Sequence, residues 1–290
     1  MADNNKNINW YPGHMEKAKK EVIESLRFVD LVIELLDARI PMSSANPLVN
    51  EICKNKPRIK LLNKADMADS EISKEWIEKF KSMGIYSLDI DSIAKKNIKK
   101  IDEVSKQALA ELISKREKKG IKTTSIRALI IGIPNVGKST LINTLSNKKK
   151  AKVGNKPGVT RILSWLNVTP TLQILDTPGI LWPKFEDNEV AYKLALTGAI
   201  KDEILDIEDL ACKGIWYMKE LYPKRIIEKY NLTDLNKEEY LILEDIAINM
   251  NFLLKGGKPD NLRAAKLFLN DLRNQKLGAI SYERPENWFI

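Results

Sequence analysis

Two short motifs hold residues that could bind a nucleotide, and the first is a phosphate loop. Residues 132–139 read Gly-Ile-Pro-Asn-Val-Gly-Lys-Ser, a glycine-rich turn that ends in Lys-Ser. In such a loop backbone N–H groups point at phosphate oxygens, and the N-terminus of the next helix favours negative charge. We expect Lys138 to bridge the β- and γ-phosphates and the Ser139 hydroxyl to bind Mg²⁺. Further nucleotide contacts are expected from Asn135, Val136, Gly137 and Thr140.

The second motif, Asn63-Lys64-Ala65-Asp66, indicates which base is bound. The carboxylate of Asp66 can accept hydrogen bonds from N1–H and N2–H₂ of guanine, and adenine has no matching pair of donors. A carboxylate covered by a base and left unpaired costs free energy, so the motif favours GTP over ATP. Ser92, in the segment 87–92, is expected in the loop that closes over the base.

Two more motifs could hold a metal ion and contact the γ-phosphate. Asp176-Thr177-Pro178-Gly179 follows an apolar segment. There Asp176 can hold Mg²⁺, usually through a water, and the Gly179 N–H can contact the γ-phosphate. Thr160 lies between the phosphate loop and Asp176, and it is the expected second protein ligand of Mg²⁺ in the GTP state. The predicted metal ligands are therefore Ser139, Thr160 and Asp176.

Alternating apolar and helical segments predict the fold that positions these motifs. Apolar, β-branched segments predict strands at 28–36, 58–62, 85–90, 127–131 and 171–175, with 162–168 beside the last. Helical patterns cover 14–27, 70–83, 97–117 and 138–147. Such alternation predicts an α/β domain with a mostly parallel sheet and helices on both faces. Ligands bind at the carboxyl ends of the strands in such sheets, which is where both nucleotide motifs begin.

The order of the motifs along the chain is unusual. In most GTPases the base motif follows the phosphate loop, whereas here it precedes the loop by about seventy residues. Strands form a sheet in space irrespective of chain order, so joining the usual termini and opening the chain after the Asp176 motif produces this order. The sequence therefore predicts a circularly permuted Ras-like GTPase domain with a phosphate loop, over residues 1–205.

The rest of the chain has a different pattern. Apolar residues repeat at helical spacing from about residue 206, which predicts a small all-α domain over residues 206–290. The last third of this domain is basic, with Lys255, Lys258, Arg263, Lys266, Arg273 and Lys276. We expect this domain to contact RNA or the ribosome.

Composition and charge limit the kind of protein and the kind of partner. The two cysteines match no metal spacing, and neither a signal peptide nor a membrane span is apparent, so we expect a cytoplasmic protein without a membrane partner. Of 48 Lys+Arg and 39 Asp+Glu, residues 206–290 hold 13 and 14, which leaves 35 and 25 for residues 1–205. The latter carry +10, with clusters at 95–100, 115–122 and 148–152. This charge favours a polyanionic partner such as RNA.

With this motif order, the chain closely resembles the ribosome biogenesis GTPase A family (RbgA, also called YlqF). The resemblance covers essentially the full length and includes Trp10 to Met15, Asp37-Ala38-Arg39-Ile40-Pro41, the phosphate loop, and residues 176–187. It implies a bacterial factor that acts late in assembly of the large (50S) ribosomal subunit, binds ribosomal RNA, and leaves after GTP hydrolysis. The expected partners are GTP or GDP and the large-subunit precursor, with a monomer off the ribosome.

The resemblance also bears on catalysis, because Ile180 stands where Ras-like enzymes place a water-orienting Gln. Isoleucine cannot orient water, so another group must do so. The resemblance implies that His14, the single histidine, is catalytic, although on its type alone it could be an ordinary turn residue. Asn135 is similar to the residue through which some family GTPases hold K⁺, but a loop Asn needs no such role.

Two other functions remain open on the sequence. The chain could be a permuted GTPase that acts on another RNA target, such as tRNA or the small subunit. It could also be a nucleotide-gated RNA-binding protein with negligible hydrolysis. Binding to isolated ribosomal subunits separates the first from the favoured function, and subunit-stimulated phosphate release separates the second.

Overall fold

The computed structural model describes residues 13–53, 56–121, 125–146, 164–177, 187–200 and 206–287, with the backbone alone for 13–18, Ser164 and Asn287. The chain forms two compact units. The first consists of Met1–Glu186 and Glu283–Ile290, and the second of Asp187–Tyr282. The boundary that we expected at 205/206 thus differs from the division in the structure. Helix α7 (Asn188–Leu196) belongs to the helical unit, and the last residues belong to the first unit.

The first unit is built on a six-stranded sheet with the strand order β3-β2-β1-β4-β6-β5. Its strands are β1 (Leu31–Asp37), β2 (Arg58–Asn63), β3 (Tyr86–Asp89), β4 (Ile126–Ile131), β5 (Ser164–Thr169) and β6 (Leu172–Asp176). Strand β5 pairs antiparallel with β6, and the other pairs are parallel. The five parallel strands therefore end at one edge of the sheet, as the sequence predicted.

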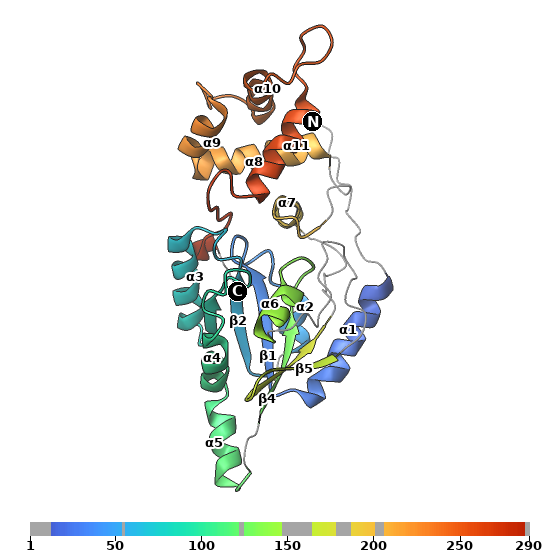
Figure 1. The fold of residues 1–290 in the computed structure, drawn as a ribbon, viewed down its shortest axis with the longest axis vertical. Coiled ribbons are helices and arrows are strands. Elements are labelled where there is room, and N and C mark those ends of the chain that lie inside the picture. Colours follow the sequence, from blue (N-terminus) through green and yellow to red (C-terminus); the bar gives the residue numbers. More distant parts are fainter. Residues whose placement is uncertain are drawn as a thin grey trace. The chain divides into compact units, whose positions relative to one another are not determined.

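Helices cover this sheet (Figure 1). They are α1 (Gly13–Ser25), α2 (Pro47–Ile52), α3 (Ser70–Ser82), α4 (Lys100–Ala108) and α6 (Lys138–Leu145), with the short 3-10 helix η1 (Leu26–Phe28). Helix α5 (Ala110–Lys118) continues from α4, and the 3-10 helix η3 (Pro285–Asn287) packs against α3. One helix predicted over 97–117 is two, because the chain leaves helical geometry at Leu109. Helix α2 was not predicted, although Asn46 caps it and Pro47 starts it.

Two apolar clusters hold the helices on the sheet. One joins Val22 of α1 and Val49 of α2 to Val32, Leu129 and Leu175 on three strands. The other packs α3 against β1 and β2 and has as members Leu36, Ala38, Leu62, Ala65, Ala68, Ile72, Trp76 and Phe80. Because this second cluster includes Leu62 and Ala65, it holds β2 and the base motif that follows it in place.

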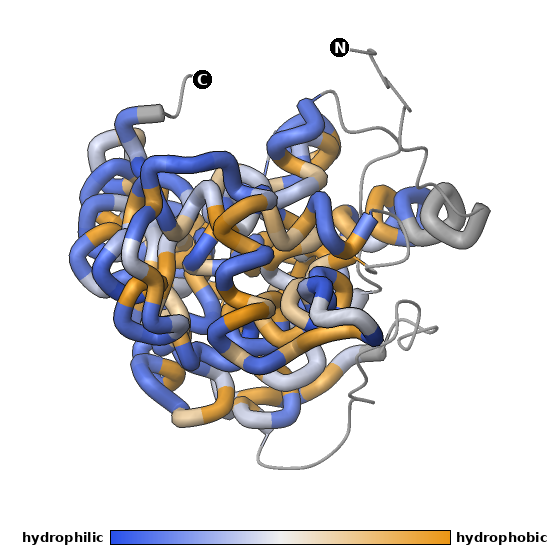
Figure 2. Tube along the Cα trace, turned by 90° about the horizontal axis from the view of Figure 1, so that it is seen from above, coloured by the Kyte–Doolittle hydropathy of each residue, from blue (hydrophilic) through white to orange (hydrophobic). Residues whose placement is uncertain are grey.

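The second unit is helical. It contains α7, α8 (Ile207–Leu221), α9 (Pro223–Tyr230), α10 (Glu239–Asn249) and α11 (Asn261–Arg273). Helix α8 packs against the four other helices. A Cβ on Gly214 of α8 would lie 2.8 Å from the Phe268 ring of α11, so glycine is what allows this close approach. Orange and blue residues alternate along the helices in Figure 2, as expected where one face is buried and the other meets water.

Candidate nucleotide site

The phosphate loop connects β4 to α6, as its sequence predicted. Val136 is buried, and Asn135 and Gly137 are half-buried with φ values of 57° and 103°. At Gly137 a Cβ would lie 2.3 Å from Nδ2 of Asn63, so no other residue fits. Lys138, Ser139 and Thr140 then form the first turn of α6, where N–H groups have no partner within the helix and favour an anion.

The base motif is hydrogen-bonded to the phosphate loop. Asn63 ends β2, and its Nδ2 donates to the Val136 carbonyl over 2.8 Å. Its Oδ1 accepts from the Ser92 hydroxyl at 2.7 Å and the Ser92 N–H at 3.2 Å. The Ser92 carbonyl in turn accepts from Thr144 of α6 at 2.7 Å. Residues 63, 92 and 136, which the sequence assigned to one site, are therefore brought together.

The remaining members of the base motif differ in exposure, with Ala65 buried and Lys64 half-buried. Lys64 has a left-handed backbone, with φ at 60°, and the Ala65 N–H donates to the Ile90 carbonyl. Asp66 is exposed. Partial desolvation of its carboxylate, together with the charge of Asp91, still raises its pKa. The carboxylate is thus accessible to a ligand. Without a bound base it is in contact with water, so the base would displace that water when it binds.

Lys138 and Asp176 form the charged part of the site. Lys138 is 7% exposed, and its Nζ donates to the Gly132 and Ile133 carbonyls at 2.8 Å each. Burial lowers its pKa to about 8, against the opposing charge of Asp176. Burial also raises the pKa of Asp176 to about 6, although Lys138 acts in the other direction. Both groups are short of countercharge, which a phosphate and a cation would supply.

The residues present fit a magnesium ion. Asp176 ends β6 at 3% exposure, and its Oδ1 is buried with no hydrogen-bond partner among the described residues. The described residues contain no group of three or more His, Cys, Asp or Glu side chains suited to a metal. Mg²⁺ does not need such a group, since it is usually held by one or two protein oxygens, nucleotide phosphates and water. Asp176 and Ser139 are the described residues that could supply those oxygens.

Three predicted site residues cannot be placed fully. Thr160 and Gly179 lie outside the described residues. The backbone of His14 is described and lies in the first turn of α1, but its side chain is not. The predicted roles of these residues therefore stay predictions.

Sequence reasoning also missed contacts at this edge. Asp37, 1% exposed at the end of β1, accepts from Lys64 of the base motif at 2.9 Å. Thr177 is fully buried and donates to the Ile130 carbonyl at 2.6 Å, which ties the end of β6 to β4. The sequence offered a signal for each residue, since Asp37 begins the Asp-Ala-Arg-Ile-Pro segment and Lys64 lies in the base motif. It offered no signal that the two side chains would pair.

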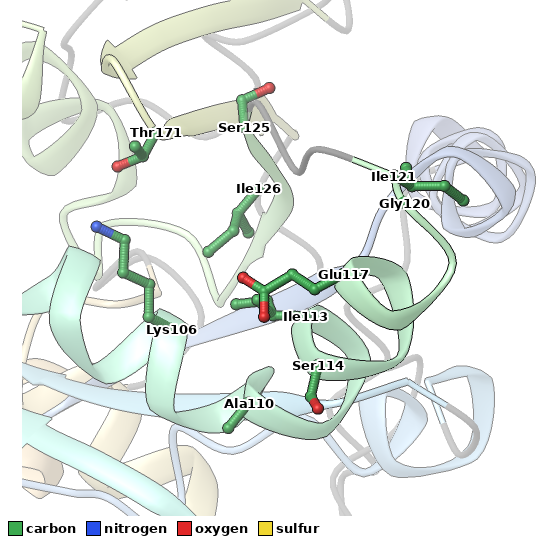
Figure 3. Close-up of a pocket in the computed structure, with 10 residues that line it drawn as sticks. All are labelled: Lys106, Ala110, Ile113, Ser114, Glu117, Gly120, Ile121, Ser125, Ile126 and Thr171. Atoms are coloured by element: carbon green, nitrogen blue, oxygen red, sulfur yellow. The ribbon is translucent and has the colours of Figure 1, made fainter.

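A separate hollow of about 890 Å³ lies elsewhere in the first unit (Figure 3). It is lined by Lys106, Ala110, Ile113, Ser114, Glu117, Gly120, Ile121, Ser125, Ile126 and Thr171. Ser125 and Thr171 precede β4 and β6, so the hollow lies at the amino ends of these strands. The phosphate loop is at their carboxyl ends, and the hollow is therefore not part of the nucleotide site.

Comparison with known proteins decides the family. A family model described as 50S ribosome-binding GTPase matches residues 127–246. Ribosome biogenesis GTPase A of Bacillus licheniformis is 48% identical over 280 residues, which is 97% of this chain and 99% of that protein. This chain belongs to the ribosome biogenesis GTPase A family. The Bacillus pumilus member is 46% identical over the same share of both chains.

The solved structures agree with this family. The GDP-bound YlqF from Thermotoga maritima covers 92% of this chain and all of its own, with 29% identity and a TM-score of 0.66. The chain is thus a GTPase with a circularly permuted domain and a helical domain, and a ribosome assembly factor. No helix in the described part is long and apolar enough to cross a membrane.

Proposed function

We propose that this GTPase acts in the cytoplasm on a late precursor of the large (50S) ribosomal subunit, binds it in the GTP state, and leaves it after hydrolysis. The observation that carries the proposal is the near full-length identity of 46–48% with ribosome biogenesis GTPase A proteins. The description of the matched family as 50S ribosome-binding supports the choice of subunit. The +10 charge of residues 1–205 supports an RNA partner.

Within the site, residues 63–66 bind guanine. Ser92 orients the side chain of Asn63, which in turn donates to the phosphate loop. Lys138 and the N-terminus of α6 bind the phosphates, with Asn135, Val136, Gly137 and Thr140 beside them. Thr160 and Gly179 complete the phosphate contacts in the GTP state. Ser139, Thr160 and Asp176 would hold Mg²⁺, which would supply positive charge beside the phosphates. A K⁺ ion beside Asn135 could add to this and is tested by comparing turnover in K⁺ and Na⁺.

The water that attacks the γ-phosphate needs a residue to orient it, and His14 has that role in our proposal. Ile180 cannot accept a hydrogen bond, whereas a neutral imidazole can. Groups that position the nucleophile typically contribute roughly a hundredfold in rate. His14→Ala should therefore remove most of the subunit-stimulated rate, leave GTP affinity near normal, and trap the protein on the particle with GTP. A stimulated rate that survives the substitution would exclude His14 from catalysis.

Sedimentation with purified ribosomal subunits tests the proposal as a whole. We expect the protein to pellet with large-subunit precursors in a non-hydrolysable GTP analogue, and to stay in the supernatant with GDP or with small subunits. Binding should weaken steeply as salt rises, because each phosphate contact releases counterions. Lys148, Lys149 and Lys150, replaced together by Gln, should weaken binding and leave thermal unfolding unchanged. Preference for small subunits or tRNA would support the first alternative, and phosphate release that subunits do not stimulate would support the second.

A further inference from the structure

The turn after β1 brings two cations to one buried carboxylate. Asp37 Oδ1 accepts from the Arg39 N–H at 3.1 Å and from Arg39 Nε at 2.9 Å. Its Oδ2 accepts from Arg39 Nη2 at 2.8 Å and from Lys64 Nζ at 2.9 Å. Arg39 is 4% exposed. Arg39 binds both oxygens and closes the turn. The contact with Lys64 is therefore an additional interaction of this carboxylate, beyond the turn itself.

That second cation belongs to the base motif. Lys64 directly follows Asn63, which lies opposite Asp37 in the register of β1 and β2. The Ala38 N–H also donates to the Asn63 carbonyl at 2.8 Å. The side chain of Lys64 keeps 22% of its surface exposed. Asp37 therefore holds the ammonium group at the tip of a base-motif side chain that is still partly accessible to a ligand.

Contacts independent of any nucleotide fix the turn itself. The Asp37 N–H donates to the Ser44 hydroxyl at 3.0 Å. Further along, the carboxylate of Glu283 accepts from the Met42 N–H at 2.6 Å, and from the N–H and the hydroxyl of Ser43. The carboxylate of Asp37 is thus held in place before a ligand binds, which is what preorganisation requires.

We propose that Asp37 is a positioning residue for guanine binding, which acts by holding Lys64 through their ion pair. The inference rests on the proposed base-binding role of residues 63–66. Without the carboxylate, Lys64 would lose the ion pair that now offsets its repulsion by Arg39, and it would turn away from the site. The bound nucleotide would then lose part of its contact with the base motif and dissociate faster, whereas the phosphate chemistry would be unaffected.

The test compares two isosteric substitutions three residues apart in one strand. Asp37→Asn should weaken binding of a fluorescent GDP roughly tenfold, chiefly through faster dissociation. Its single-turnover hydrolysis rate at saturating GTP should match wild type. Glu34→Gln is the matched control, since Glu34 is equally buried and pairs with Lys60, but lies in the middle of the sheet. It should bind GDP as wild type does, even if it unfolds more easily.

A double-mutant cycle shows whether Asp37 acts through Lys64. In a Lys64→Met background, Asp37→Asn should add little further loss of GDP affinity. Losses that multiply independently, or wild-type affinity in Asp37→Asn, would overturn the inference. If Asp37→Asn does not fold, Lys64→Met probes the same contact from the partly exposed partner. It should show the same roughly tenfold loss of GDP affinity. Wild-type GDP affinity in Lys64→Met would also overturn the inference.

A separate measurement distinguishes failure of this inference from failure of the base motif. Asp66→Asn should shift preference from guanine to xanthine nucleotides. If that shift occurs but Asp37→Asn binds GDP normally, only the positioning role is wrong. If Asp66→Asn keeps full guanine selectivity, the base-binding role of residues 63–66 is wrong, and the inference falls with it.

Discussion

Strands β1 and β2 carry two buried ion pairs that look alike and differ in position. Glu34 and Lys60 lie opposite each other in mid-strand, with 2.6 Å between Oε2 and Nζ, and the Lys60 ammonium lies 5.4 Å from the Phe80 ring. Asp37 and Lys64 form the second pair where the strands end. The first pair lies between the sheet and α3, whereas the second includes the lysine of the base motif. The same chemistry can therefore serve stability at one position and ligand binding at the other.

The largest expected effect comes from removing the lysine of the phosphate loop. Lys138→Met should lower GTP affinity by about a hundredfold, because charge-assisted hydrogen bonds to phosphate are lost. The unfolding free energy of the nucleotide-free protein should not fall, since burial already disfavours the charge of Lys138. Isothermal titration calorimetry with GTP and urea unfolding measure the two quantities. A stability loss as large as the affinity loss would contradict this reading of the site.

The corresponding change in mid-sheet should have the opposite signature. Lys60→Met leaves Glu34 buried without its cation, so the free energy of unfolding should fall by about 3 kcal/mol. GTP affinity of the folded protein should stay within about twofold. Adding Glu34→Leu should restore much of the stability, because both buried charges are then gone. The comparison breaks if Lys60→Met folds normally but binds GTP poorly.

A smaller effect is expected at the exposed carboxylate of the base motif. Asp66→Asn replaces one acceptor by a donor, which suits the C2 oxygen of xanthine and removes one guanine contact. We expect roughly a tenfold to hundredfold change in the ratio of GTP to XTP affinity, and little change in stability, because Asp66 is exposed. Competition with fluorescent GDP measures the ratio. Wild-type protein that bound ATP as tightly as GTP would exclude this motif from base recognition.

The pH dependence of stability should report on Asp37. Burial raises its pKa, but the charges of Arg39 and Lys64 outweigh burial and hold it well below the ordinary value of 3.8. A lowered folded-state pKa adds stability that is present above the unfolded-state value and is lost as pH falls below it. At pH 7, Asp37→Asn should therefore be less stable than wild type, by about 3 kcal/mol. The difference should shrink below pH 4 in denaturant unfolding, and a constant difference would show that the ion pair contributes nothing.

The smallest effect concerns Cys53, a buried thiol in the apolar cluster that also contains Val22 and Val49. Burial raises the pKa of its thiol to about 12; the charge of Arg58 lowers it and that of Glu34 raises it. At pH 8 the thiol should react with a chromogenic disulfide at least roughly a hundredfold more slowly than a free cysteine, because little thiolate forms. Denaturant should restore full reactivity. Fast reaction in the native protein would show that this side of the sheet opens to solvent.

The sequence predicted the sheet and the positions of its motifs well, for physical reasons that can be named. In β4, the strand before the phosphate loop, every residue except Arg127 is buried, and three of them are isoleucines. Lys138 starts a helix, as expected. By contrast, the break at Leu109 was missed, since the helical pattern of 97–117 continues through it. Helix α2 is only six residues long, too short for a periodic pattern to show.

What the sequence by itself determined is local: each nucleotide motif follows a strand, and their order requires a permuted domain. What only the tertiary structure decided is which of these segments hold one another. Ser92 reaches Asn63 across 29 residues, Lys64 reaches Asp37 across 27, and Glu283 reaches Ser43 across 240. Such contacts leave no periodicity in the chain, because they depend on strand register and on where a distant segment returns. Which charges are buried, and which partners they have, is visible only in the folded structure. The roles inferred for these charges therefore depend on that structure.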